Sequence, residues 1–342
     1  MRAAGLSQDL VRGGHPGERY LFRVVCSQIF FDPSMRSGTD RNTPRRNALS
    51  VSSRNHPDRK KMSKSKGNTQ GPADFVDEFG ADGLRYWACH ATQGIDTGVD
   101  KGQMKVGRRL AVKLLSVARF VLGMLPEGFT GGEITEPIDV AMTDALHQVS
   151  LRAEAAFERN DYRGALVEIE SFFWHWCDDY VELVKSRAYG DSETAASAHA
   201  ALAQGLSILQ RLLAPFVPIV AEESWSWTHD GSVHREPWPG SNADAESITL
   251  HDGDPGPDAF EFAADVLHQI RRAKTSKHVG MRTPVVQLTV LGTADQLALF
   301  RAGSPDLCAA GSVEKVTEAQ TGSNDGFRVE IELGDPPPKA PA

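Results

Sequence analysis

Apolar residues recur at intervals of three and four positions through most of the chain after residue 72, the period of an α-helix with one buried face. One stripe runs from Met104 to Pro126, and the Gly-rich stretch 128–132 after it indicates a connection ending at Pro137. Further helices are predicted at about 139–159, 162–188, 192–214 and 217–228. Helices of this length with short connections predict an antiparallel bundle.

The helical region opens at Pro72, which suits a first helical turn because its missing N–H has no intrahelical partner there. Phe75 and Phe79 are four positions apart and therefore share one face. Gly80 is suited to ending this helix, and Asp82 is placed to cap a second helix directly after it.

The pattern changes near the C-terminus. A polar, Gly/Pro/Asp-rich linker is predicted at 239–258, then an amphipathic helix that includes Phe260. Val285–Leu291 and Phe327–Leu333 alternate as strands do, so a small α/β domain is predicted, followed by a Pro-rich disordered tail. The predicted fold class is mainly α.

The helix that includes Phe260 ends in a basic run at 271–277, with Arg271, Arg272, Lys274 and Lys277. Two interpretations are equally supported. The run can meet a phosphate backbone, or it can complement the negative end of its own helix dipole.

Aromatic and acidic residues share the predicted helix 162–188. Phe172, Trp176 and Tyr180 follow one another at four-residue spacing, with Phe173 beside them, and this spacing favours a buried stripe over an exposed platform for RNA bases. The acidic residues have no metal-ligand partner beside them, so a solvated face or a contact between helices is favoured. They are Asp178, Asp179 and Glu182.

Charge is unevenly distributed. The net charge is −8, but residues 1–67 hold 14 Lys/Arg against 5 Asp/Glu and the remainder holds 23 against 40. This acidity argues against nonspecific binding of nucleic acid, and leaves room for a specific RNA met by a local basic face.

The cysteines have neither the spacing of a zinc site nor that of a disulfide framework, so we predict no metal site and a cytoplasmic location. Small buried apolar side chains are the expected state of all four, Cys26, Cys89, Cys177 and Cys308. The most apolar run, 205–221, is too short and too interrupted to span a bilayer.

Four lysines gather at Lys60, Lys61, Lys64 and Lys66, interrupted by serines and followed by glycine, directly ahead of the predicted helix at Pro72. Lysine is a mobile point charge that can follow a phosphate during reaction. Serine hydroxyls and backbone N–H groups beside a glycine bind the same oxygens at short range. The segment fits a flexible polyphosphate clamp.

Lys61-Met62-Ser63-Lys64-Ser65, with Lys66-Gly67-Asn68 after it, resembles the signature loop of class I aminoacyl-tRNA synthetases. The segment 78–87 resembles the sequence after this loop in the valine, isoleucine, leucine and methionine members, and 96–109 is most similar to the valine-specific ones. The segments 176–182, 212–218 and 234–239 resemble their anticodon-binding helices.

The resemblance implies ATP-dependent activation of valine and its transfer to tRNA, with Mg²⁺ held mainly by the ATP phosphates and neither a membrane nor DNA as partner. Lys61 and Lys64 would be catalytic. The residues that would bind the nucleotide are Lys61, Met62, Ser63, Lys64, Ser65, Gly67 and Asn68.

The resemblance also implies a domain plan, which begins with a divergent, poorly ordered remnant of the catalytic Rossmann domain at 1–56. The signature loop and connecting helices come next, then the helical anticodon-binding bundle, the linker, the small α/β domain and the tail. Their predicted ranges are 57–137, 138–238, 239–258, 259–335 and 336–342.

The family's His-x-Gly-His-like nucleotide motif is not found in the sequence; Gly13-Gly14-His15-Pro16 has a single histidine. We therefore expect the C-terminal portion of an enzyme, incomplete and inactive alone, with a start that is truncated or frame-disturbed. Two alternatives stay open: a stand-alone tRNA-binding helical module without catalysis, and a relative specific for isoleucine or leucine.

Overall fold

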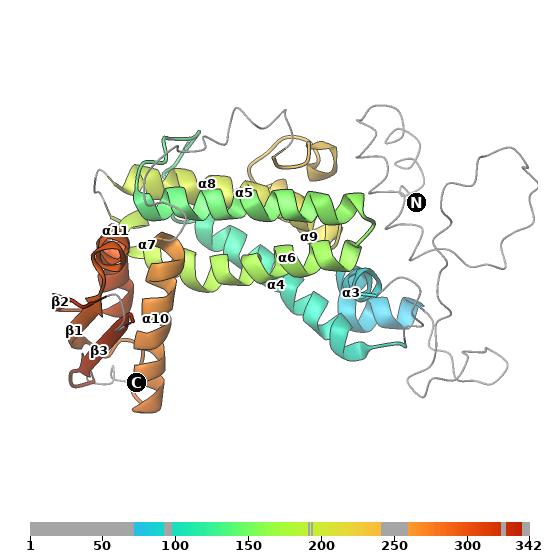
Figure 1. The fold of residues 1–342 in the computed structure, drawn as a ribbon. Helices are drawn as coiled ribbons and strands as arrows, with labels where there is room; N and C mark the ends of the chain where they lie inside the picture. Colours follow the sequence, from blue (N-terminus) through green and yellow to red (C-terminus); the bar gives the residue numbers. More distant parts are fainter. Residues whose placement is uncertain are drawn as a thin grey trace, which may run out of the picture. The chain divides into compact units, whose positions relative to one another are not determined.

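The computed structural model describes residues 72–91, 98–190, 192, 194–240, 259–322 and 326–336. Within them the chain is mainly helical with one small sheet, as its periodicity predicts (Figure 1). The lysine-rich segment 60–68, the region 1–56 and most of the linker 239–258 lie outside the described residues, so the predictions made for them stay predictions.

The predicted elements are present to within a few residues, and 162–188 is one run interrupted by a single π-helical turn, η3. The helical elements are α3 (Pro72–Cys89), α4 (Lys101–Leu122), α5 (Pro137–Glu158), α6 (Tyr162–His175), η3 (Trp176–Tyr180), α7 (Val181–Ala188), α8 (Ala195–Leu213), α9 (Pro218–Trp225), η4 (Val233–Arg235), α10 (Ala259–Ser276) and α11 (Ala294–Gly311). The strands are β1 (Val285–Gly292), β2 (Val316–Gln320) and β3 (Arg328–Leu333).

The chain divides into two compact units that interleave along the sequence. The first comprises Met1–Arg119, Ser150–Glu170 and Ser207–Asp244, and the second Phe120–Val149, Ser171–Leu206 and Ala245–Ala342. Helices α4, α5, α6 and α8 contribute residues to both units.

In the first unit, α3 bends at Gly80, whose φ of 77° and ψ of 160° interrupt the helix (Figure 1). A residue with a Cβ is strained at such a φ, which is why glycine suits this position. The bend brings Phe75 and Phe79 from one half and Leu84 and Trp87 from the other into one core with Met104 of α4. The predicted helix break at Gly80 is confirmed.

The second half of α3 holds the N-terminus of α9. The Asp82 carboxylate accepts hydrogen bonds from the backbone N–H groups of Ile219 (3.2 Å) and Val220 (2.9 Å). Arg85 donates to the Pro215 carbonyl at 2.8 Å. Asp82 therefore caps a helix distant in sequence, and the prediction that it caps its own helix is wrong, because a buried carboxylate is better satisfied by unpaired N–H groups of a neighbouring helix end.

Helices α3 and α4 cross closely at Gly107, where any Cβ would collide with the Tyr86 ring. The Tyr86 hydroxyl donates to Glu170 of α6 at 2.6 Å. Burial and the Glu170 carboxylate raise the pKa of Tyr86 well above its ordinary value, so it stays a hydrogen-bond donor. The segment after Gly80 is thus the part of α3 that fixes α4, α6 and α9.

The aromatic stripe of the second unit is buried, as its spacing predicts. Phe172 is 8% exposed, while Trp176 and Tyr180 are fully buried. Gly205 of α8 lies against the Trp176 indole, where even a Cβ would be too close. This stripe is core and offers no surface to RNA bases.

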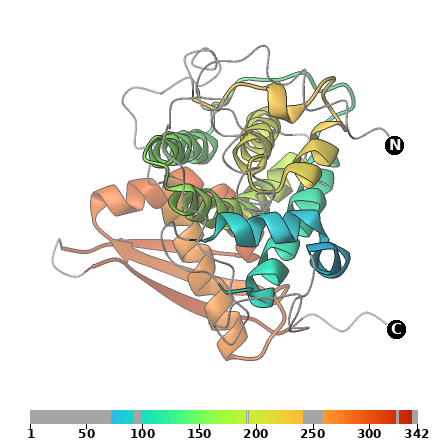
Figure 2. The same cartoon turned by 90° about the vertical axis from the view of Figure 1, so that its right-hand side faces the viewer.

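The sheet of the second unit has strand order β2-β1-β3, with β1 parallel to β2 and antiparallel to β3. A parallel pair needs a crossover, which α11 supplies between β1 and β2. Helices α10 and α11 pack on each other and on the sheet, and α10 lies across the strands in Figure 2. The sequence predicted β1 and β3 and did not predict α11 or β2.

A buried ionic cluster ties α11 to the helices of the second unit. Arg187 of α7 donates to both carboxylate oxygens of Asp139 on α5 (2.8 Å each) and to Asp306 on α11 (2.8–3.2 Å). Tyr180 and Ser197 donate to the same Asp139 carboxylate at 2.8 and 2.6 Å. Every charge in the cluster has an opposite partner, which is the condition under which buried charges are tolerated.

The acidic residues of η3 serve a contact between helices. Asp179, 3% exposed, accepts from His175 (2.7 Å) on its own run and from His268 (2.7 Å) and Arg271 (2.8 Å) of α10. Burial would raise the pKa of Asp179, but the hydrogen bonds and charges of His175 and His268 hold it below its usual range, so it is ionised. The predicted helix contact is confirmed for Asp179, while Asp178 is exposed.

The same contact makes stability depend on pH. Burial alone would lower the pKa of His175, but the Asp179 hydrogen bond and the Glu261 carboxylate at 3.1 Å outweigh it and raise the pKa to about 9. Protonated His175 therefore stabilises the fold fully below pH 6.5, and this contribution is lost as the pH rises through about 9.

We expect the free energy of unfolding to fall by about 2 kcal/mol between about pH 6 and pH 10 through His175, as urea unfolding at each pH would measure. His175→Gln is the control, because it keeps a polar side chain that does not titrate. If the free energy of unfolding depends on pH equally in the wild type and in His175→Gln, this assignment is contradicted.

Candidate nucleic-acid interface

Three surface features stand out in the described residues: an aromatic pair of which one ring is exposed, a polar pocket and a basic helix end. The predicted nucleotide-binding residues, Lys61 to Asn68, lie outside the described residues.

The aromatic pair belongs to the second unit. Tyr189, which follows α7, is 58% exposed, the largest exposed fraction of any Phe, Tyr or Trp in the described residues. Its ring meets that of Phe120 edge to face, with centroids 6.5 Å apart. Lys185 Nζ lies 5.3 Å from the Phe120 ring centroid, a cation–π contact. We call Phe120, Lys185 and Tyr189 the aromatic platform.

Contacts at the end of α7 hold the backbone on either side of Tyr189. Arg187 is locked in the buried ionic cluster, and it also donates to the Thr194 carbonyl at 2.9 Å. A ring nitrogen of His199, on α8, bonds the Ala188 carbonyl at 2.8 Å. Because its neighbours are held, Tyr189 presents its ring with little conformational freedom to lose. An exposed ring such as that of Tyr189 stacks on unpaired bases. The Lys185 ammonium group beside it also lies 3.4 Å from a carboxylate oxygen of Glu182.

Sequence reasoning missed this platform because it examined the aromatic stripe at 172–180. A usable signal existed: Tyr189 precedes Gly190 and follows the last apolar position of the helical stripe, Ala188. An aromatic residue that lies beyond the end of a helix's buried face is exposed more often than an aromatic residue within that face.

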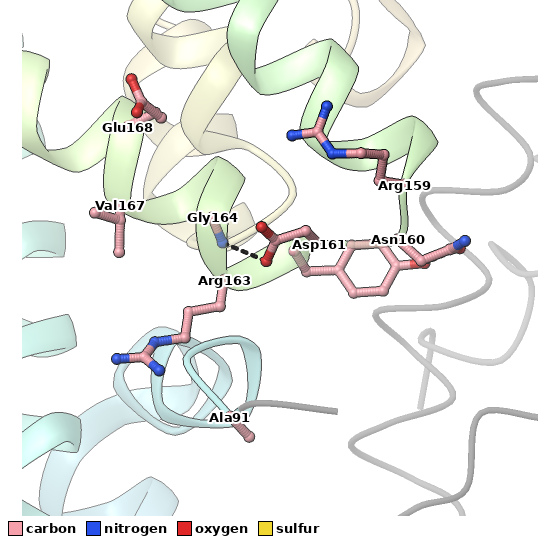
Figure 3. Close-up of a pocket in the computed structure, with 9 residues that line it drawn as sticks. Ala91, Arg159, Asn160, Asp161, Arg163, Gly164, Val167 and Glu168 are labelled. Carbon is pink, nitrogen blue, oxygen red and sulfur yellow. Dashed lines mark hydrogen bonds between the residues drawn. The ribbon is translucent and has the colours of Figure 1, made fainter. Parts of the chain in front are cut away.

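The polar pocket belongs to the first unit and has a volume of about 550 Å³. It lies where the end of α3 meets the turn between α5 and α6 (Figure 3). It is lined by Ala91, Arg159, Asn160, Asp161, Tyr162, Arg163, Gly164, Val167 and Glu168. The Asp161 carboxylate is committed to the start of α6, where it accepts from the Gly164 N–H at 2.8 Å.

Two guanidinium groups reach this pocket. In Figure 3 Arg159 projects from the end of α5, and Arg163 projects over the end of α3. Burial first, and then the charge of Arg163, lower the pKa of His90, the residue directly after α3, which keeps that imidazole neutral at pH 7. Because Glu168 and Asp161 also line the pocket, its charges balance, and it suits a polar group such as a ribose better than a bare phosphate.

The basic helix end is the run at 271–277, for which the sequence left two interpretations. Arg271 pairs with Asp179, and Lys274 is 2% exposed, with its ammonium group bonded to the carbonyls of Met281 (2.9 Å) and Gly311 (2.8 Å). Arg272 and Lys277 are exposed. The structure therefore divides the run: Lys274 is buried, Arg271 is half-buried and paired, and Arg272 and Lys277 face solvent.

No group of His, Cys, Asp and Glu suited to hold a metal ion is found in the described residues. Cys89 and Cys177 are buried as predicted, but Cys308 is only partly so; its thiol lies 3.7 Å from Ser304 Oγ, and burial raises its pKa. None of the described helices is both long and apolar enough to cross a lipid bilayer.

Two protein families match the chain. Residues 35–100 match the family described as "tRNA synthetases class I (I, L, M and V)", and residues 139–290 match "Anticodon-binding domain of tRNA ligase". The contacts of Asp82, Arg85 and Tyr86 with later segments of the chain thus join the first match to the second.

The chain is also similar to curated proteins named valine–tRNA ligase. The protein of Salinispora tropica is 45% identical over 293 residues, covering 81% of this chain and 34% of the relative, and that of Cutibacterium acnes is 44% identical over 287 residues, covering 83% and 32%. The chain spans about a third of the length of these relatives.

A solved ternary complex of Agrobacterium radiobacter K84 LeuRS with tRNA and LeuAMS is 25% identical, with a TM-score of 0.47 over 58% of this chain and 24% of that chain.

Proposed function

We propose that this chain, which belongs with the valine–tRNA ligases of the class I aminoacyl-tRNA synthetases, carries the ATP-handling loop and the tRNA-docking bundle of such an enzyme. The observation that carries the proposal is 45% identity to a valine–tRNA ligase over 81% of the chain. Within the chain, a segment that matches the class I synthetase family precedes one that matches the anticodon-binding family.

The proposed reaction has two steps. The valine carboxylate attacks the α-phosphorus of ATP, which forms valyl-adenylate and releases pyrophosphate; the valyl group then passes to a ribose hydroxyl of the terminal adenosine of tRNA. The first step builds negative charge on the α-phosphate and on the leaving pyrophosphate. Cations held where this charge develops lower the barrier.

In this proposal Lys64 meets the developing charge and Lys61 supports it. Ser63 and Ser65 position the loop with their hydroxyls, and Gly67 lets the backbone turn close to the nucleotide. Met62 and Asn68 complete the nucleotide-binding segment. Mg²⁺ would accompany ATP, bound mainly by the phosphates.

The second role is docking of the anticodon arm of tRNA, and the aromatic platform supports it. An anticodon loop offers unpaired bases, and Tyr189 and Phe120 offer rings beside the ammonium group of Lys185. The stand-alone RNA-binding alternative shares this role, so only an assay of catalysis separates the two.

The proposal is tested in two assays. The chain alone should bind tRNA(Val) more tightly than random RNA of the same length in filter binding. Together with the N-terminal portion of a valine–tRNA ligase, it should support charging of tRNA(Val) with valine and not with isoleucine or leucine. Equal affinity for random RNA would remove the tRNA role, and no charging in the complemented form would leave only the RNA-binding alternative.

Tyr189→Ala is expected to weaken tRNA binding by about 5–50-fold, because one lost stacking contact costs about 1–3 kcal/mol. Tyr189→Phe should retain most of the affinity, since it keeps the ring. The folded state should be unaffected, because Tyr189 is exposed. Wild-type affinity in the alanine variant, measured by filter binding, would remove Tyr189 from the interface.

A further inference from the structure

The C-terminal end of α10 and the turn into β1 form a part of the second unit that is rich in exposed cations. The chain has no Asp or Glu between Asp265 and Asp295, although its net charge is −8. Four basic side chains of this stretch are exposed: Arg272, Lys277, His278 and Arg282. We call these four residues the basic turn.

The buried Lys274 makes this turn rigid. Its ammonium group bonds the carbonyl of Met281, directly before Arg282, and the carbonyl of Gly311 at the end of α11. Burial lowers the pKa of Lys274, and the two carbonyls satisfy the charge that remains. Arg282 is also fixed from the other side, because Thr283 is fully buried and its N–H bonds the Gly280 carbonyl at 3.0 Å.

The helix end itself closes in a defined way. The Val279 N–H bonds the Lys274 carbonyl at 3.1 Å and the His278 N–H bonds the Thr275 carbonyl at 3.0 Å. His278 adopts a left-handed φ of 55°, where glycine is the usual residue. The turn therefore keeps one conformation and presents its cations without a large entropy cost on binding.

Two residues next to the basic turn make hydrogen bonds that do not involve it. Glu314 lies beside the start of β1, where its N–H bonds the Val285 carbonyl at 2.9 Å. Arg271, one residue before Arg272, is already paired with Asp179. Neither contact involves any of the four residues of the basic turn.

We propose that the basic turn is a docking surface for the phosphate backbone of tRNA, separate from the aromatic platform. This inference rests on the proposed tRNA-binding function and deepens it. Arginines suit phosphate oxygens because the planar guanidinium donates two parallel hydrogen bonds. Phosphate contacts position a nucleic acid without reading its sequence, so the basic turn would set the register of the RNA and contribute no preference between tRNAs.

The test compares two double variants of the full chain that remove the same charge. Arg272→Gln with Arg282→Gln removes two cations of the basic turn. Arg301→Gln with Arg328→Gln removes two exposed cations elsewhere on the same unit. Arg328 pairs in register with Leu291, near the end of β1 far from Arg282, roughly 20 Å along the strand at about 3.3 Å per residue.

The affinity for tRNA(Val), for a non-cognate tRNA and for polyglutamate is measured between about 50 and 200 mM salt. We expect the Arg272/Arg282 variant to lose about tenfold affinity for both tRNAs and to lower the salt slope by about 2, since each phosphate contact contributes about 1. The control variant should keep the wild-type slope.

Each of the other outcomes rejects either the basic turn as an RNA-docking surface or the proposed function itself. If the wild type prefers tRNA and the Arg272/Arg282 variant binds it equally well, the basic turn is not a docking surface for RNA. The proposed function then still stands. A wild type that does not prefer tRNA to random RNA removes the proposed function and this inference with it. Loss of polyglutamate binding alone, with tRNA binding unchanged, would assign the basic turn to an acidic protein and overturn RNA as its partner.

Discussion

Lys64→Ala is expected to lower ATP–pyrophosphate exchange by at least about 100-fold in the full-length enzyme or in the complemented chain, because one preorganised group aimed at developing charge contributes that much. The charge on the α-phosphate and pyrophosphate is greatest in the transition state. The loss should therefore appear in kcat, with a smaller change in the KM for ATP.

Lys60→Ala is the matched control. It removes an equal charge one position outside the signature pentapeptide, at a residue that the resemblance does not place among those that bind the nucleotide, and should change exchange by no more than about threefold. Lys61→Ala should fall between the two, since Lys61 is assigned a supporting role. Retained exchange in Lys64→Ala would contradict the role given to this residue.

Arg187→Met is expected to destabilise the second unit by about 3–5 kcal/mol, because it leaves Asp139 and Asp306 buried and without a cation. Asp139 is fully buried and Asp306 is 6% exposed. Burial already raises the pKa of Asp306 even with Arg187 beside it. Urea unfolding followed by circular dichroism at pH 7 measures the change as a lower midpoint.

Two further variants test whether the loss of stability in Arg187→Met comes from the buried carboxylates that lose their cation. Arg187→Lys keeps the charge and loses the planar fork that bonds two carboxylates at once, so it should destabilise less than the methionine variant. Arg301→Met breaks an exposed pair with Glu318 and should cost no more than about 1 kcal/mol. A methionine variant at position 187 that unfolds at the wild-type midpoint would show that the cluster is not needed for stability.

The two predictions with the largest expected effects, those for Lys64 and Arg187, come from different kinds of information. The role proposed for Lys64 comes from a contiguous motif, Lys61 to Ser65, that can be read without any structure. Nothing in the sequence around Arg187 marks it: Lys185 is two positions away on the same helix, yet it is exposed and touches the Phe120 ring. Which of two nearby cations is buried depends on the direction of each side chain on the helix and on what packs there.

Local patterns were sufficient for most of the helical elements and for the break at Gly80. Gly80 ends a helix because of its own backbone freedom, and the four-residue spacing of Phe172, Trp176 and Tyr180 places them on one buried face. Such properties are set within a few residues of the chain. Helix α11 was missed because Pro305 and several small residues weaken its apolar period, and β2 because its five residues are mostly exposed.

Partners distant in sequence could not be predicted. Asp82 looks like the cap of its own helix and caps α9 instead. For Asp179 the sequence left a solvated face and a helix contact open, and could not name α10 as the partner. Arg272 and Lys274 are two positions apart in one basic run, yet one is exposed and the other is buried against Gly311. The side chains of this run are chemically alike, so their roles differ only through what the fold brings next to them.

By itself, the sequence determined the family resemblance and the helical character and predicted the residues proposed to bind ATP, because a contiguous motif and a helical period are properties of neighbouring residues. The tertiary structure alone decided which charged groups are internal ties and which remain free to meet RNA. The physical reason is that burial and pairing depend on packing between segments more than a hundred residues apart, such as Arg187 and Asp306.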